Sequence, residues 1–414
     1  MKTNIIDHLD HPKTLEKLYR DNKSLFKKEF NHVYPDISEH PTARVWHERL
    51  NFEKEEITWG ASKDVIFLIV AIFLAGLIAK IPDLANLDQD FFFSRNFAFA
   101  VFPFLTAWFA WKQHMPWNRL LVVAAAFLVS AIYINILPNN PDSHTLVLAC
   151  IHLPLLLWAI LGYTFVGDEV RNYRKRLDFL GFNGDLVVLT TIILIAGALL
   201  AGVTYGLFTL IDIPLENFYV KYLLIWGLPA APIVGTYLVR TNPHLVNKVS
   251  PVIAKVFTPL VLLMLVIYLI AVVVTGKDPY NDREFLLVFN LLLIGVMAII
   301  LFSTTETSKT SGNKTTTLLL LALSAVTVIV NGIALSAILF RITEWGITPN
   351  RIAVLGSNVL ILINLLMVTY GLFKVWRKGE KAAKVENSIA AYLPIYAVWV
   401  LLVVFLFPVL FGFR

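Results

Sequence analysis

Long uninterrupted runs of apolar residues constrain this chain more than any other feature of its sequence. Each run is roughly 18 to 27 residues long, about the length that an α-helix needs to cross the ~30 Å hydrocarbon core of a bilayer. Hydrophobic residues make up 57% of the 414 residues and charged residues only 15%, whereas soluble domains carry about 25% charged residues. The runs do not alternate apolar and polar positions, as transmembrane β-strands do. We therefore predict an all-α, polytopic integral membrane protein.

Eleven such runs follow one another along the chain and predict about eleven transmembrane helices. They cover approximately residues 64–81, 97–111, 119–137, 145–166, 185–211, 219–239, 255–275, 284–302, 315–340, 351–376 and 388–411. Together they form a predicted transmembrane bundle over residues 61–414.

The first 60 residues differ from the rest, because they mix charges with apolar residues at helical spacing. Leu15, Phe26 and Phe30 recur on one face of a predicted helix over residues 13–30. A second short helix follows the breaks at Pro35 and Pro41. No apolar signal sequence precedes the first span. We expect residues 1–60 to be a water-facing helical segment in the cytoplasm.

The basic residues of the loops give the expected orientation. Loops on one side of the predicted membrane hold 16 Lys and Arg, and the loops and span ends on the other side hold eight. Cytoplasmic loops carry the excess of Lys and Arg. This alternation places the N-terminus in the cytoplasm and, with an odd number of spans, the C-terminus outside.

Several function classes lack any support in the sequence. Neither a phosphate-binding loop, nor a zinc-protease motif, nor a nucleophile elbow occurs. The single cysteine, Cys150, lies inside an apolar run, where it is expected to be a small buried hydrophobe. The net charge of +6 resides in loops beside the spans, so it does not indicate nucleic-acid binding. We expect no cofactor and no metal, and the sequence supports no enzyme.

The turn between the ninth and tenth spans combines charge with turn-forming residues. Arg341, Glu344 and Arg351 place two cations and one carboxylate at the predicted outer boundary. Guanidinium groups match the oxygens of phosphates and carboxylates, so this cluster is a candidate site for an anionic headgroup. The alternative is a purely structural turn, in which Thr348 caps the tenth helix and Pro349 occupies its first position.

The segment Trp345–Arg351, with the sequence WGITPNR, resembles the aromatic-Gly-Leu-Thr-x-x-Arg signature of a bacterial membrane protein family. That family is catalogued as domain of unknown function 4153. The resemblance covers mainly residues 300–380, with Trp345 where Tyr is more usual. It implies a bacterial cytoplasmic (inner) membrane protein, and it implies no activity.

Polar residues inside two spans are further candidates for a binding site. Ser324, Thr327 and Asn331 share one face of the ninth span, and Asn358 and Asn364 lie in the tenth. Polar groups within the membrane are costly and often functional, so these faces are expected to line a polar cavity or, alternatively, to form hydrogen bonds between packed helices.

The sixth span contains Gly227, Pro229 and Pro232. The two prolines cannot donate backbone hydrogen bonds, so a kink or break is predicted there. Broken helices expose backbone groups to ligands in transporters, but a proline kink can also serve shape alone.

Three functions therefore remain open. The first is a permease or ligand-handling membrane protein with a cavity between spans six, nine and ten. The second is an enzyme that acts on a lipid or glycan at the outer face, and the third is a partner-binding component. The expected partners are the lipid bilayer and a small-molecule or lipid ligand, nucleic acid is not expected, and the protein partner of the third alternative is unknown.

Overall fold

The computed structural model describes residues 5–21, 23–51, 60–140, 142–209, 219–243, 245, 249–276, 280, 283–309, 314–380 and 382–414. Every regular element within these residues is a helix, and none is a strand. This confirms the predicted all-α fold. The chain divides into two compact units, Met1–Thr58 and Trp59–Arg414.

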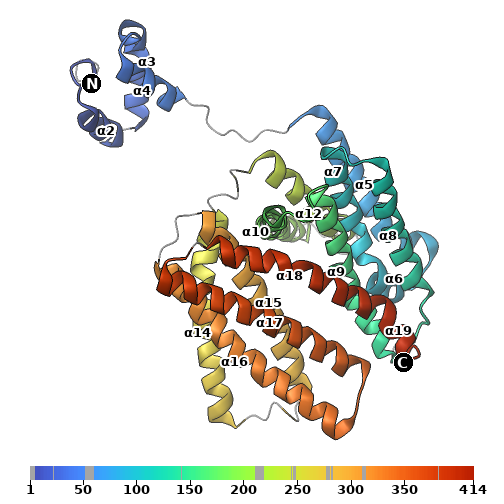
Figure 1. Cartoon of the computed structure of the whole chain (residues 1–414). Coiled ribbons are helices and arrows are strands. Elements are labelled where there is room, and N and C mark those ends of the chain that lie inside the picture. The colour runs from blue at the N-terminus through green and yellow to red at the C-terminus, as the bar shows by residue number, and fades with distance from the viewer. Residues whose placement is uncertain are drawn as a thin grey trace. The chain divides into compact units, whose positions relative to one another are not determined.

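Three helices build most of the described part of the N-terminal unit (Figure 1). They are α2 (Pro12–Asp21), α3 (Lys23–Ile37) and α4 (Pro41–Asn51). Leu15, Phe26, Phe30 and Trp46 are at most 5% exposed and form their shared core. The helix expected over residues 13–30 is divided between α2 and α3, and Pro35 lies inside α3 instead of ending it.

Nine helices in the described part of the second unit are long and apolar enough to cross a membrane. Seven of these stretches lie in α5 (Ser62–Ala85), α8 (Trp117–Ile136), α9 (His144–Val166), α10 (Tyr173–Thr209), α14 (Val249–Thr275), α16 (Lys314–Trp345) and α17 (Pro349–Lys378). The other two are Lys221–Thr241, which includes α12 (Ile225–Thr241) and the turn before it, and Ala383–Leu410, which begins with α18 (Ala383–Leu401). A further helix, α15 (Arg283–Lys309), contains a shorter apolar stretch, Leu292–Thr304. These helices support a multi-pass membrane protein.

The second predicted span, residues 97–111, is not one long helix. Here the chain forms α6 (Gln89–Asn96), the 3₁₀ turn η1 (Phe97–Ala100) and α7 (Phe102–Lys112). Pro103 lies in the first turn of α7, where its missing N–H costs no hydrogen bond. A proline in that place begins a new helix, so the apolar run is divided and α7 has only 11 residues.

Two π-helical turns each precede a helix that contains proline. η2 (Tyr219–Leu224) leads into α12 with Pro229 and Pro232, and η3 (Leu402–Leu406) leads into α19 (Phe407–Leu410) with Pro408. A proline ring crowds the carbonyl four residues earlier. For Pro408 that carbonyl, of Val404, lies inside η3, whereas for Pro229 and Pro232 it lies within α12. In η3 the carbonyl of Phe405 accepts a hydrogen bond of 2.9 Å from the Tyr133 hydroxyl.

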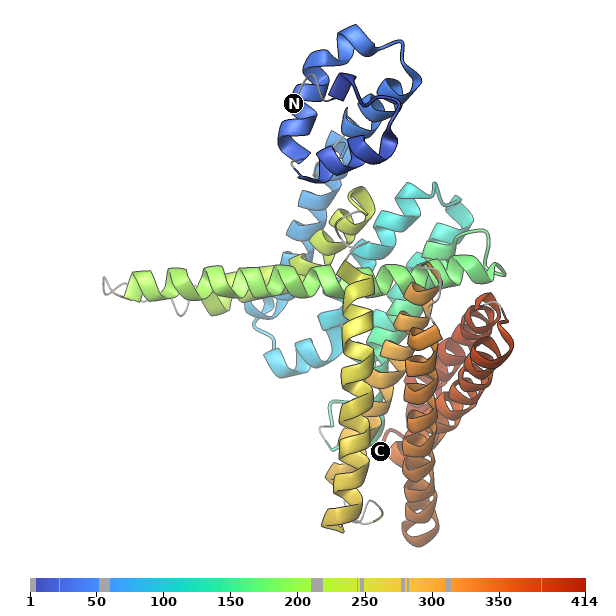
Figure 2. The same cartoon turned by 90° about the vertical axis from the view of Figure 1, so that its left-hand side faces the viewer.

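The longest helix, α10, runs across the direction of α14 and α16 (Figure 2). Its N-terminal half packs through Phe179 and Phe182 into a cluster that also holds Phe109 and Phe165. Its C-terminal half is exposed, with Leu200 70% accessible. The fifth span therefore packs against α12 but crosses the direction of α14 and α16.

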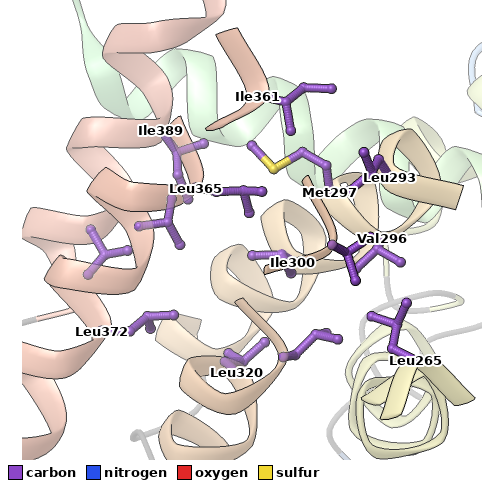
Figure 3. Close-up of a cluster of buried hydrophobic side chains, with 14 of the residues drawn as sticks. Leu265, Leu293, Val296, Met297, Ile300, Leu320, Ile361, Leu365, Leu372 and Ile389 are labelled. Carbon is purple, nitrogen blue, oxygen red and sulfur yellow. The ribbon is translucent and has the colours of Figure 1, made fainter. Parts of the chain in front are cut away.

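Helices α14 to α18 enclose the largest apolar cluster of the molecule (Figure 3). Figure 3 shows Leu265 of α14, Met297 of α15, Leu320 of α16 and Leu365 of α17 directed into it, and Leu265 and Leu365 are fully buried. Lipid is as apolar as these side chains, so close packing holds the helices together more than the hydrophobic effect does.

Aromatic side chains pack directly onto glycines at several helix contacts of the described structure, and at two of these contacts the ring is a tryptophan. A Cβ on Gly76 of α5 would lie 2.2 Å from the ring of Trp226 in α12, and a Cβ on Gly356 of α17 would lie 2.1 Å from the ring of Trp399 in α18. Only glycine leaves room for these rings. The two notches fix how α5 meets α12 and how α17 meets α18.

Hydrogen bonds join loops and helix ends of the second unit to one another in two groups, one at each end of the unit. At the first, Arg95 donates to Asn139 (3.3 Å), Asn350 bonds to His144 (2.9 Å), and the backbone N–H of Thr145 donates to the carbonyl of Arg414 (2.9 Å). We call this the Arg414 end. All of these segments belong to the side that the basic residues predict to be outer.

The opposite end joins the segments predicted to be inner. Lys112 bonds to Asp64 (2.6 Å), and Gln113 donates to the carbonyl of Phe165 (2.6 Å). Arg176 donates to the carbonyl of Ala390 (3.0 Å), which Pro394 leaves without its helical donor. We call this the Arg176 end. The loops therefore segregate as the alternation of the spans requires.

Candidate functional site

The turn between α16 and α17 uses Arg351 to hold its own backbone. The guanidinium Nη1 donates to the carbonyls of Trp345 (2.7 Å) and Gly346 (2.6 Å). Thr348 caps α17 by accepting from the backbone N–H of Arg351 (3.3 Å), and Gly346 supplies the left-handed conformation with φ +78°. This geometry matches the structural alternative, a well-built turn.

The other two charged residues of the turn do not complete an anion site. The guanidinium of Arg341 lies 5.0 Å from the Trp345 ring centroid, and that of Arg351 lies 5.7 Å from it. Glu344 is exposed and has no ion pair with either arginine within the described structure. The structure thus brings the arginines together around Trp345 but does not place Glu344 between them.

The polar residues predicted in spans nine and ten are buried in the α16–α17 hairpin. Asn331, Asn358 and Asn364 are 0%, 2% and 1% exposed. Asn364 donates to the hydroxyl of Tyr396 (3.0 Å), which is the interhelical bonding of the alternative interpretation. Both amide atoms of Asn331 are buried without a partner in the described part of the chain, as is the amide nitrogen of Asn358.

The predicted helix break is placed differently. α12 is helical without interruption from Ile225 to Thr241, so Gly227, Pro229 and Pro232 lie inside a continuous helix. The irregular turn is η2, directly before it. α12 packs mainly against α5 and α10. Within the described residues, span six therefore does not pack beside spans nine and ten, as the expected cavity between these three spans requires. Instead, the ring of Trp226 in α12 packs on Gly76 of α5 and holds these two helices together.

A site that sequence reasoning did not single out surrounds Arg95, in the last turn of α6. Asp88 caps this helix by accepting from the N–H of Phe91 (2.6 Å). The amides of Asn96 and Asn135 exchange two hydrogen bonds of 2.9 and 2.8 Å, which join α6 to α8. These contacts hold the side chain of Arg95 inside the protein, where it is 2% exposed.

The guanidinium of Arg95 is held by neutral groups. It donates to the carbonyl of Ile134 (3.2 Å), the carbonyl of Phe91 (3.5 Å) and the amide oxygen of Asn139 (3.3 Å), and it lies 4.0 Å from the Phe91 ring centroid. A guanidinium has five N–H donors, so two of them are not engaged by these three bonds. No carboxylate in the described residues lies within ion-pair distance. Burial lowers the pKa of Arg95, but an arginine keeps its proton in proteins.

Arg95 lies on the wall of a cavity of about 650 Å³ at the Arg414 end. The polar part of the wall comes from Asp88, Asp90, Ser94, Arg95 and Asn139. The apolar part comes from Phe91, Phe97, Leu146, Val147, Ile151 and Pro154, and Cys150 lies among them. The cavity therefore combines one buried cation, two carboxylates and a hydrophobic surface.

A second cavity of about 400 Å³ lies on the other side of Phe97. Its lining is almost entirely apolar and includes Ile78, Phe93, Leu228 and Pro229. Pro229, which was expected at a helix break, thus lies at a cavity beside α5 and α6.

Local sequence gives a weak signal for Arg95. It is the one basic residue in the aromatic run Phe91–Phe97, beside a predicted span. The residues that accept its hydrogen bonds include Ile134 and Asn139, which lie 39 and 44 residues away in the sequence. Only the folded chain shows that they contact Arg95.

Comparison of the sequence with protein-family models and with curated proteins, and of the structure with solved structures, found no significant match.

Proposed function

We propose that the chain is a ligand-handling membrane protein that binds the acidic group of a lipid or similar amphiphile at Arg95. The observation that supports this proposal is the buried guanidinium of Arg95 on the wall of the cavity of about 650 Å³. It has no carboxylate partner among the described residues. A buried charge without a counter-ion is costly. A phosphate or carboxylate accepts two parallel bonds from a guanidinium, so such a group would stabilise Arg95.

Native mass spectrometry of the purified full chain with added dioleoyl phospholipids tests this proposal. Replacing Arg95 by Gln removes the charge while keeping one amide donor. We expect binding to weaken about tenfold or more, because hydrogen bonds to charged groups contribute about 1.5–3 kcal/mol. Arg119→Gln is the matched control, since Arg119 pairs with Asp168 at the Arg176 end. Equal lipid affinity of the Arg95 variant and the wild type would reject the proposal.

Cys150 provides a second readout. It is the only cysteine of the chain and is partly exposed on the cavity wall. A ligand beside Arg95 should slow alkylation of this thiol in the wild type, and the Arg95→Gln variant should lose that protection.

A second candidate function is a permease for a polar solute along α16 and α17. The amide of Asn331 is 0% exposed and has no hydrogen-bond partner among the described residues, and this observation favours the permease. A buried amide without partners costs about 1–3 kcal/mol per group, and a bound solute would offset that cost. Co-purification of a polar small molecule with the wild type, lost on Asn331→Leu, tests this function.

We also propose a bacterial inner-membrane location with the Arg176 end in the cytoplasm. The excess of Lys and Arg in the loops at that end supports this orientation. We likewise propose that the chain is related to the family catalogued as domain of unknown function 4153, and the segment Trp345–Arg351 supports this proposal.

A further inference from the structure

The cavity beside Arg95 has a charge pattern that a simple anion does not match. One guanidinium faces it, but the carboxylates of Asp88 and Asp90 line it as well. The two carboxylates outnumber the single cation. A ligand with only negative charge would be attracted by Arg95 and repelled by both aspartates.

These charges also lie at different depths. Arg95 is buried, at 2% exposed, whereas Asp88 and Asp90 are exposed, as is Ser94 between them and Arg95 in sequence. Asp88 and Asp90 stand at the start of α6, at the Arg414 end. A ligand that enters from the exposed side of the cavity, which is its mouth, therefore meets the carboxylates first and the guanidinium next.

The apolar wall follows α9 away from the mouth. Leu146, Val147, Ile151 and Pro154 recur at helical spacing and line the cavity from one face of α9. Val147 and Ile151 are 46% and 61% exposed, so this wall continues onto the apolar surface of the bundle. In a membrane that surface meets the acyl chains, and the cavity is open to them from the side.

From this order of groups we infer that the ligand is an aminophospholipid, a zwitterion of the ethanolamine type. Its phosphate diester would bind Arg95, its ammonium would lie near Asp88 and Asp90, and an acyl chain would follow Val147 and Ile151. The order of groups in such a lipid, from acyl chain to phosphate to ammonium, matches the order along the cavity, from apolar wall to guanidinium to carboxylates. This inference rests on the proposed function, since it names the ligand of the same site.

The test uses the full chain in detergent and two lipids with identical dioleoyl chains, one with an ethanolamine and one with a glycerol headgroup. Binding is measured by native mass spectrometry and by protection of Cys150 from alkylation. We expect the ethanolamine lipid to bind about fivefold more tightly, the effect of one or two exposed ion pairs. Soluble O-phosphoethanolamine should give no protection at the same concentration.

The decisive variant is the double substitution Asp88→Asn and Asp90→Asn. Asn caps a helix as well as Asp does, so α6 keeps its start while both charges are lost. We expect the preference for ethanolamine to disappear, whereas Asp142→Asn, a carboxylate of the same end outside the cavity lining, should leave it unchanged.

The outcomes separate the two proposals. Tighter binding of the glycerol lipid to the wild type, or an unchanged preference in the double variant, would overturn the aminophospholipid while leaving the acidic-group site intact. Protection by O-phosphoethanolamine equal to that by the lipid would overturn the lipid nature of the ligand. Unaltered binding of both lipids to Arg95→Gln would remove the proposed function itself.

Discussion

Replacing Gly356 by Ala should destabilise the membrane unit, because Trp399 already occupies the space that a Cβ needs. The added carbon would lie 2.1 and 2.2 Å from two atoms of the indole, against 3.4–4 Å for ordinary contact. The ring would have to move by more than an ångström. Its Nε1–H would then lose the 3.0 Å hydrogen bond to the Ser357 hydroxyl.

The expected loss follows from three contributions. Overpacking costs about 1–3 kcal/mol, and the lost hydrogen bond about 0.5–1.5 kcal/mol. Replacing glycine by alanine within a helix returns about 0.5–1 kcal/mol. We therefore expect a net destabilisation of about 1–3 kcal/mol.

Thermal unfolding of the purified chain in detergent measures this effect. Gly332→Ala is the matched control, since Gly332 lies in the neighbouring helix α16 and a Cβ there meets nothing within 4 Å. It should leave the melting temperature unchanged or raise it slightly. Adding Trp399→Leu to Gly356→Ala should recover part of the loss. A melting temperature of Gly356→Ala equal to that of Gly332→Ala would refute the packing argument.

Three further predictions concern other parts of the chain. Asn331→Leu removes two buried polar atoms that have no partner among the described residues and should raise the melting temperature, gaining about 1 kcal/mol or more. Asn364→Leu removes one such atom, Oδ1, but also breaks the hydrogen bond to Tyr396, and should therefore give a lower melting temperature than Asn331→Leu. The pKa of Glu16 is held below its ordinary 4.5 mainly by a hydrogen bond from Arg20, so its stabilisation is complete above that value and is lost as pH falls through the lower folded pKa. Pepsin should therefore cleave the N-terminal unit increasingly as the pH falls below about 4.5, and this pH dependence should be weaker in Glu16→Gln. Reporter fusions at the C-terminus and in the loop between α17 and α18 should report opposite sides of the membrane, and matching signals would contradict the orientation.

The sequence predicted those features of the fold that depend on local composition. Apolar runs of membrane-spanning length gave the helices, and helical spacing placed Asn331 and Asn364 correctly on buried faces. Spacing alone did not show that Asn364 bonds to Tyr396 while Asn331 finds no partner among the described residues. That difference depends on the neighbouring helices.

The sequence did not correctly predict features that depend on contacts between residues far apart in the chain. The prolines of α12 predicted a break, but the helix continues through them after the π turn η2, and Trp226 packs against Gly76 of α5. Arg95 looked like one of several loop cations. Its burial depends on Ile134 and Asn139, which only the fold brings to it.

Two hydrogen bonds join the start of α9 to residues that are synthesised much later. The hydroxyl of Ser143 donates to the carbonyl of Phe413, and the N–H of Thr145 donates to the carbonyl of Arg414. The first of these pairs is separated by 270 residues. Helix α9 can therefore leave the ribosome long before the two carbonyls that accept hydrogen bonds from its start exist. Until residues 413 and 414 are synthesised, Ser143 and Thr145 at the start of α9 lack these two acceptors, so a ribosome stalled before them would leave both donors without these partners.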